Sequence, residues 1–383
     1  MGALKLFLIA GEPSGDRLGA ALMAGLRQLV PDVVFCGVGG PLMQAEGLES
    51  LFPMEELSVM GIAEVLPKYR HLKRRIRETA NAALTLGVDA VISIDSPDFC
   101  LRVARIVKDA SPDLRTIHYV APSVWAWRPG RAVKMAKVID HVLAILPFEP
   151  PLMTATGMTC DFVGHPVVAE PLATADEAAA LRTKLGADPL ILALPGSRRG
   201  EVTRLAPVLG EVIAQVKARH PGVQVALPTL RGIEPLVREL TSAWAVAPHI
   251  ILDPAEKRAA FAAADVAIAA SGTVSLELAA NACPMVIAYD MHPFSFWLMQ
   301  RAALIDTVTL VNLVTDTRVV PEFLGPRCRA DLVAPALLSL IEDAPAQARQ
   351  VQAMDLTMER LGRGAEAPGL RAARSVLSAL NRT

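Results

Sequence analysis

The chain of 383 residues contains five cysteines, and no two of them form a C-x-x-C pair. Such scattered cysteines fit reduced, mostly structural thiols in a cytosolic protein and argue against a disulfide framework. The seven histidines also lack any spacing that is typical of metal ligands. We therefore expect neither a metal ion nor another cofactor.

The sequence also lacks an excess of positive charge and a long apolar run. Its net charge is −1 at pH 7, which argues against a general nucleic-acid binder, because binding to phosphate backbones requires a basic excess. No run of about 18 apolar residues could span a membrane, and the predicted strand at the N-terminus argues against a signal peptide. With 52% apolar and 20% charged residues, the chain is expected to be globular and long enough for two domains.

Short apolar runs alternate with helix-length segments along most of the chain. They predict strands at residues 5–10, 33–38, 88–94, 116–120 and 141–146 and, after a connector, at 190–194, 223–227, 250–252, 265–269 and 284–288. Near-continuous apolar strands separated by helices are typical of parallel sheets that are covered on both faces. The sequence therefore predicts an α/β fold of two Rossmann-like parallel-sheet domains facing a cleft, at residues 1–170 and 171–345, followed by a helical tail at 346–383.

The second domain opens, at residues 190–201, with a strand that leads into a glycine turn and a helix. The unpaired N–H groups and partial positive charge of such a helix N-terminus attract anions. Arg198 adds a planar pair of donors that suits a phosphate group, and Ser197 and Glu201 lie close to it in sequence. The alternative is an ordinary strand-to-helix loop with a solvated arginine pair, and this stretch alone leaves both interpretations open.

A second loop of this kind follows the predicted strand at residues 265–269. Ser271, Gly272 and Thr273 could offer donors to an anion. Glu277 lies about one helical turn later, where its carboxylate could accept two hydroxyls of a ribose. Helix capping is the alternative for Ser271 and Thr273, and a solvated helix carboxylate is the alternative for Glu277. Two such loops in one domain favour a nucleotide diphosphate over these structural explanations.

Carboxylates lie near the ends of strands in the first domain. Asp95 and Asp98 follow the strand at residues 88–94, and Glu12 lies in the turn after the first strand. Ligands of parallel sheets bind beyond the carboxyl ends of the strands, where a carboxylate could accept a proton from a hydroxyl. An Asx-type turn is the alternative. We favour this turn for Asp98, and both interpretations remain open for Asp95.

A basic segment with apolar residues at helical spacing covers residues 62–80. Val65, Leu66 and Leu72 are among the apolar residues, and Lys73 and Arg74 belong to a group of six basic residues at the other positions. Such a pattern usually marks a solvated helix face, but a basic amphipathic helix also lies on anionic lipid. The sequence leaves both interpretations open.

Several strings of the sequence resemble the lipid-A-disaccharide synthase family, in order and over nearly the whole chain. They are AGEPSGD at residues 10–16, MGI with EVL at 60–66, IDSPDF at 94–99, HYV with PSVWAW at 118–127, LPGSR at 194–198, SGT at 271–273, and PF with FWL at 293–298. The resemblance implies a GT-B glycosyltransferase fold that works without a metal. It also implies that the C-terminal tail packs back on the N-terminal domain.

The reaction that this resemblance implies is an inverting transfer of 2,3-diacylglucosamine from its UDP derivative to 2,3-diacylglucosamine 1-phosphate. The products are UDP and a β-1,6-linked disaccharide 1-phosphate. The implied UDP-binding residues are Ser197, Arg198, Glu201, Ser271, Gly272, Thr273, Glu277 and Asn312. The implied acceptor residues are Glu12, Ser14 and Asp95, with Asp95 as the catalytic base.

The implied partners are the two acylated sugars and the anionic inner membrane, with the enzyme peripheral on its cytoplasmic face. Val65, Leu66, Leu72, Lys73 and Arg74 are the expected membrane contacts. Nucleic acid is not an expected partner, and the sequence leaves open whether the chain forms a homodimer. The rival functions are another GT-B enzyme of UDP-sugars, such as a 2-epimerase or a peptidoglycan glycosyltransferase, and a non-catalytic nucleotide-binding module at the membrane surface.

Overall fold

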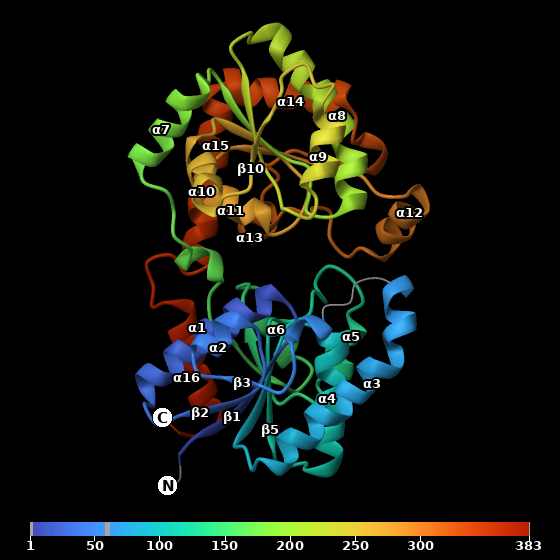
Figure 1. The fold of residues 1–383 in the computed structure, drawn as a ribbon, viewed down its shortest axis with the longest axis vertical. Helices are drawn as coiled ribbons and strands as arrows, with labels where there is room; N and C mark the ends of the chain where they lie inside the picture. Colours follow the sequence, from blue (N-terminus) through green and yellow to red (C-terminus); the bar gives the residue numbers. More distant parts are fainter. Residues whose placement is uncertain (1–2, 58–61, 383) are drawn as a thin grey trace. The chain divides into compact units, whose positions relative to one another are not determined.

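The computed structural model describes residues 3–57 and 62–382, and it gives only the backbone for residues 62–69. The chain divides into two compact units, one made of Met1–Ala169 with Leu361–Thr383 and the other of Glu170–Arg360. Each unit is built on one parallel sheet with helices on both faces (Figure 1). The predicted α/β fold with two parallel sheets is therefore confirmed.

The sheet of the first unit has seven strands in the order β3-β2-β1-β4-β5-β6-β7, all of them parallel. The strands are β1 (Lys5–Ala10), β2 (Val34–Val38), β3 (Glu49–Ser50), β4 (Ala90–Ile94), β5 (Arg115–Tyr119), β6 (His141–Ala144) and β7 (Thr159–Phe162). The helices are α1 (Pro13–Leu29), α2 (Pro41–Ala45), α3 (Ile62–Thr85), α4 (Pro97–Ala110), α5 (Gly130–Met135), α6 (Pro150–Thr154) and α16 (Pro368–Ala379), and short 3-10 helices cover Met54–Glu56 and Pro166–Ala169.

Strand β1 lies inside this sheet and is buried on both faces. Leu6 and Leu8 belong to one hydrophobic cluster, which α1 and α16 cover, whereas Phe7 and Ile9 belong to a second cluster under α3 and α4. The division follows from strand geometry, because successive side chains point to opposite faces. In Figure 1, α1 and α16 lie on one side of the sheet, and α3 and α4 lie on the other.

Helices α1 and α16 approach each other closely because glycines lie at their contact. A Cβ atom on Gly25 would lie 2.6 Å from the backbone oxygen of Gly369, and a Cβ atom on Gly369 would lie 2.5 Å from that of Ala21. Both distances are shorter than van der Waals contact, so a larger residue at either position would push the helices apart. The close packing ties the last helix of the chain to the first.

The sheet of the second unit has six parallel strands in the order β10-β9-β8-β11-β12-β13. The strands are β8 (Leu190–Leu194), β9 (Gln224–Pro228), β10 (His249–Ile251), β11 (Val266–Ala269), β12 (Met285–Tyr289) and β13 (Glu322–Leu324). The helices are α7 (Ala175–Leu185), α8 (Arg199–Arg219), α9 (Glu234–Thr241), α10 (Pro254–Ala263), α11 (Val274–Ala280), α12 (Pro293–Ala302), α13 (Leu310–Thr315), α14 (Ala330–Glu342) and α15 (Ala344–Arg360), with a 3-10 helix at Gly325–Arg327.

The C-terminal tail divides between the two units, which differs from the expectation that residues 346–383 pack back on the first domain. Helix α15 packs against α11, α13 and α14, and the side chain of Gln350 bonds to the backbone of Met285 in β12. Of the two tail helices, α16 packs against α1 in the first unit. The physical reason is that α15 carries its own buried face, which includes Met354 and Met358, and this face belongs to the second unit.

Candidate active site

Asp95 lies directly after β4, at the carboxyl end of the first sheet. The backbone of Asp95 and of Ser96 is left-handed, with φ of 52° and 44°, a conformation that is uncommon outside glycine. The backbone N–H of Asp95 donates to the carbonyl of Tyr119 in β5 (2.9 Å). Its carboxylate is half-buried and has no hydrogen bond or ion pair to any residue within the described part of the chain. Strained backbone next to an unengaged carboxylate is typical of a functional site.

The turn after β1 lies beside the turn that carries Asp95. A Cβ atom on Gly11 would lie 2.8 Å from the hydroxyl oxygen of Ser96, so the two turns approach each other closely. Glu12 is half-buried and is the N-cap of α1, and Ser14 is exposed in the first turn of that helix. The structure therefore brings the turn that contains Glu12 close to the turn that contains Asp95. Asp98 lies further along, in the first turn of α4, and is exposed.

Asp16 in the same string has a structural role that the sequence analysis did not assign. It is 3% exposed, and its carboxylate accepts hydrogen bonds from the backbone N–H groups of Gly40 (2.9 Å), Leu42 (3.0 Å) and Met43 (3.0 Å) at the start of α2. An anion at a helix N-terminus satisfies the unpaired donors there. Asp16 thereby holds α1 against α2, and its charge is engaged within the protein.

Glu149 is a buried carboxylate that sequence reasoning missed. It accepts hydrogen bonds from the indole N–H of Trp125 (3.2 Å) and from the backbone N–H groups of Ile145 (3.2 Å) and Leu146 (3.0 Å). Burial raises the pKa of Glu149 to about 7, although these hydrogen bonds act in the opposite direction. Glu149 connects the tryptophan-containing loop after β5 to the loop after β6.

Two buried histidines of the first unit are held in the neutral form. Burial lowers the pKa of His118 and of His165 to about 4. The imidazole of His118 bonds to the hydroxyl of Ser93 (2.7 Å), and Nδ1 of His165 accepts the backbone N–H of Val167 (3.2 Å). His165 therefore caps the short 3-10 helix at Pro166–Ala169.

In the second unit, the loops after β8 and β11 leave neighbouring strands. Leu194 pairs with Ala269 at the ends of these strands, and the N–H of Ala270 donates to the carbonyl of Leu194 (2.9 Å). Ser197 and Arg198 follow β8, and residues 271–273 follow β11. The structure therefore brings together the two loops that the sequence analysis identified separately.

Glu201 occupies part of the predicted anion site. Its carboxylate accepts the backbone N–H groups of Ser197 (3.1 Å) and Arg198 (3.3 Å), and it forms an ion pair with the Arg198 guanidinium (3.2 Å). A Cβ atom on Gly196 would lie 2.5 Å from this carboxylate, and φ of Gly196 is +107°. The loop therefore requires glycine, and two of the N–H groups expected to face an anion are already bonded to Glu201.

The loop after β11 is open at its tip. Gly272 and Thr273 are exposed, Ser271 is half-buried, and no heavy atom lies within 4 Å of a Cβ atom built on Gly272, whose φ is +129°. Helix α11 begins at Val274 and has seven residues. Glu277 forms an ion pair with Lys257 of α10 at 2.6 Å, so its carboxylate has a partner within the protein.

Asn312 is buried within α13, and both ends of its amide are engaged. The amide nitrogen donates to the hydroxyl of Thr307 (3.1 Å) and to the carbonyl of Val320 (3.0 Å), and the amide oxygen accepts the N–H of Val320 (3.1 Å). Glu322 of β13 accepts the backbone N–H groups of residues 308 and 309. Asn312 and Glu322 together fix the loop that leads into α13.

The basic face of α3 is partly paired and partly open. Arg75 is paired with Glu56 (2.8 Å) and Glu78 (2.7 Å), and the first of these contacts lowers the pKa of the Glu56 carboxyl. Leu72 is half-buried, and Lys73 and Arg74 are exposed. Val65 and Leu66, the other two expected membrane contacts, lie outside the residues whose side chains the structure describes.

Within the described residues, no three histidine, cysteine, aspartate or glutamate side chains are grouped so that they could hold a metal ion. None of the described helices is both long enough and apolar enough to cross a bilayer.

Two parallel-sheet units with polar loops at the carboxyl ends of their strands are typical of the GT-B class of folds. Solved structures of this class are similar to the whole chain. A putative UDP-N-acetylglucosamine 2-epimerase from Listeria monocytogenes has a TM-score of 0.67 and 14% identity, with 100% of this chain and 98% of that chain covered. Anabaena Alr3699/HepE, solved in complex with UDP and glucose, has a TM-score of 0.59 and 14% identity, with both chains covered completely. These similarities show the fold.

Sequence comparison gives the family. The family model for lipid-A-disaccharide synthetase matches residues 6–369. The lipid-A-disaccharide synthase of Ruegeria pomeroyi is 62% identical over 387 aligned positions, which cover 98% of this chain and 96% of that protein. The chain belongs to the lipid-A-disaccharide synthase family and is a glycosyltransferase of lipid A biosynthesis. The predicted family, fold and activity are thus confirmed.

Proposed function

We propose that the chain transfers 2,3-diacylglucosamine from its UDP derivative to 2,3-diacylglucosamine 1-phosphate, with inversion at the anomeric carbon. The observation that carries this proposal is the pair of polar loops on the adjacent strands β8 and β11, because a nucleotide diphosphate needs donors from more than one element. The presence of UDP in the related HepE structure supports the same class of donor. The acceptor is inferred from the family's activity in lipid A biosynthesis.

The donor site in this proposal lies at the loops after β8 and β11. Arg198 and Ser197 bind the diphosphate, and the hydroxyls of Ser271 and Thr273 add donors. Gly272 allows a phosphate to approach the backbone, since no side chain fills the space beside it.

Three further residues of the second unit support the donor site. Glu201 orients Arg198 through their ion pair. Glu277 binds the ribose hydroxyls, and Lys257 holds its carboxylate in place. Asn312 contributes by holding the loop before α13, because its amide is already bonded within the protein.

The acceptor site lies at the turns after β1 and β4, where Glu12 and Ser14 bind the acceptor and Asp95 acts as the base. The carboxylate of Asp95 takes the proton of the acceptor's 6-hydroxyl while that oxygen bonds to the anomeric carbon. The bond between this carbon and the diphosphate oxygen breaks, and UDP leaves with the electron pair. Arg198 stabilises the charge that develops on UDP.

Release of UDP tests this function against its rivals. We expect the full chain to release UDP from the diacylated donor only when the diacylated sugar 1-phosphate is also present, because the acceptor hydroxyl is the nucleophile. A coupled assay for UDP with each sugar omitted in turn measures this dependence. Consumption of the donor without an acceptor would instead indicate an epimerase, and binding of UDP without turnover would indicate a nucleotide-binding module.

We further propose that the enzyme is peripheral on the cytoplasmic face of the inner membrane and that α3 makes the contact. The apolar residues Val65, Leu66 and Leu72 enter the interface, and Lys73 and Arg74 bind anionic head groups. The exposure of Lys73 and Arg74 supports this role.

Replacing Val65, Leu66 and Leu72 together by serine is expected to release the folded protein from anionic vesicles, because the apolar part of the interface is lost. Vesicle sedimentation measures the bound fraction, and circular dichroism checks the fold. Raising the salt concentration should give a similar but partial effect, because salt screens only the charges.

A matched control replaces one valine and two leucines that are exposed elsewhere, Val34 (45% exposed), Leu172 (51%) and Leu230 (58%). This control should stay bound to the vesicles. If the α3 variant unfolds, its three residues belong to the core and the membrane role is wrong.

A further inference from the structure

A groove of about 570 Å³ lies between three helices of the first unit, α3, α4 and α5. Helices α3 and α4 share a buried cluster that contains Ile76 and Val103, and α4 and α5 share another that contains Ala104 and Met135. In Figure 1 the three helices lie side by side on one flank of this unit. The groove is therefore built from packed elements of the fold, and its volume lies in the range of ligand sites.

Five cations line this groove, and its lining contains no carboxylate. Lys73 and Arg77 come from α3, Arg102 and Arg105 from α4, and Lys134 from α5. The spacings of four and three residues place each helical pair on one face of its helix. All five side chains are exposed, and none has an ion pair or hydrogen bond to another residue among those that the structure describes.

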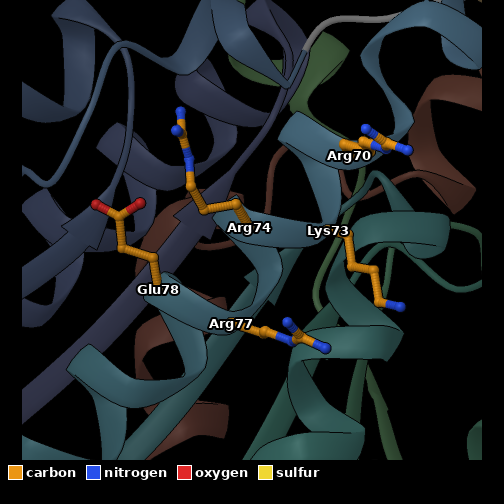
Figure 2. Close-up of a pocket in the computed structure, with 5 residues that line it drawn as sticks. All are labelled: Arg70, Lys73, Arg74, Arg77 and Glu78. Carbon is orange, nitrogen blue, oxygen red and sulfur yellow. The ribbon is translucent and has the colours of Figure 1, made fainter.

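Two other basic residues of α3 and α4 have carboxylate partners. Arg75 pairs with Glu56 and Glu78, and Lys108 pairs with Asp140 at 2.7 Å. Figure 2 shows a neighbouring pocket on α3, in which Lys73 and Arg77 extend to one side of the helix and the carboxylate of Glu78 to the other. Carboxylates therefore neutralise Arg75 and Lys108, whereas the five cations that line the groove have no such partner among the described residues.

The floor of the groove is apolar. Ile76 is 8% exposed and Val138 is 2% exposed, and the half-buried Leu101 also lines the groove. A cationic rim over an apolar floor is complementary to a ligand that joins an anionic group to a hydrocarbon chain. Inorganic anions would use the rim alone and would leave the apolar floor in water.

We propose that this groove binds one molecule of a phosphate-bearing acylated lipid, with the phosphate on the cationic rim and the first part of an acyl chain on the floor. The inference rests on the proposed function in one respect: that function places the enzyme at a membrane surface, where such lipids are present. It differs from the membrane contact proposed above, because it assigns a discrete, saturable site that includes α4 and α5.

The test uses the full chain and the double variant Arg102→Gln with Arg105→Gln. The probe is monomeric dihexanoyl phosphatidic acid, and binding is measured by titration calorimetry. We expect saturable binding to the parent chain and a loss of about fivefold in affinity per cation removed, hence roughly 25-fold for the double variant. Dihexanoyl phosphatidylcholine, which has the same chains but a zwitterionic head group, should bind much more weakly.

A matched control replaces Arg231 and Arg349, two exposed arginines of the second unit, by glutamine. It removes the same charge from the protein and should bind phosphatidic acid as the parent does. Equal weakening in the control would show diffuse attraction and overturn the site. Inorganic phosphate that binds as tightly as phosphatidic acid would overturn the role of the apolar floor.

The double variant should also be folded and at least as stable as the parent, because it removes repulsion between like charges. A folded variant with unchanged lipid affinity would overturn the proposal. The binding measurement contains neither sugar substrate. If lipid binding fails, the proposed glycosyl transfer is unaffected. If the unsubstituted chain fails to transfer the sugar, the proposed lipid site is unaffected.

Discussion

Replacing Asp95 by asparagine is expected to lower turnover about a hundredfold or more while UDP still binds, since a general base contributes at least this factor. An acceptor hydroxyl is a poor nucleophile at neutral pH and must lose its proton as the glycosidic bond forms. The Asp95 carboxylate is half-buried at the end of β4 and makes no bond within the described residues, so it is available to a substrate. The measurement is steady-state turnover beside a UDP titration.

Asparagine is the appropriate substitute at this position. The φ of Asp95 is 52°, and asparagine adopts this left-handed conformation more readily than other residues with a side chain. Alanine would add backbone strain of roughly 1–2 kcal/mol, so Asp95→Ala is informative only if the variant is shown to be folded.

The matched control for this prediction is Asp98→Asn, which alters an exposed carboxylate three residues further along the chain. It should affect turnover much less, and only through the shape of the loop. If Asp95→Asn keeps near-normal turnover, the base lies elsewhere. Glu12, in the neighbouring turn, then becomes the next candidate.

Replacing Arg198 by alanine is expected to weaken use of the UDP donor by roughly 1.5–3 kcal/mol, the range for a hydrogen bond to a charged group. This corresponds to about ten- to 150-fold in kcat/KM for the donor. The Arg198 side chain is 63% exposed and contacts Glu201 at 3.2 Å, so the guanidinium is both accessible and oriented. Donor and acceptor titrations of the variant separate the two substrates, and only the donor dependence should change.

Arg199→Ala is the matched control, because Arg199 is the exposed neighbour that begins α8. Its donor kinetics should remain close to those of the parent. Arg198→Lys should be intermediate, since lysine keeps the charge but lacks the planar pair of donors. Unchanged donor kinetics in Arg198→Ala would remove this residue from the donor site.

The interior strands were predictable from the sequence, whereas three strands at sheet edges were missed. β1, β4 and β8 are continuous apolar runs because helices cover both of their faces. The edge strands β3, β7 and β13 have only two to four residues, and each contains at least one polar or charged residue. These segments form strands because they bond to the neighbouring strand of the sheet. Nothing in their own sequence distinguishes them from loops.

The positions of the candidate site residues were also predictable, but their partners were not. Asp95, Ser197 and Ser271 follow apolar strands, so their location at a sheet edge follows from local pattern alone. The ion pair of Glu277 with Lys257 depends on how α10 and α11 pack. Likewise, the burial of Glu149 depends on two loops that are separated in sequence.

The central claim is that both acylated sugars are joined by this chain, and product analysis tests it most directly. The full chain is incubated with the UDP-linked diacylglucosamine and the diacylglucosamine 1-phosphate, and the products are examined by mass spectrometry and proton NMR. We predict a disaccharide 1-phosphate that carries the acyl groups of both substrates, a β anomeric signal, one UDP per disaccharide, and loss of product in the Asp95→Asn variant. An epimerised UDP-sugar, or an unchanged pair of substrates in the presence of folded protein that binds UDP, would contradict the claim.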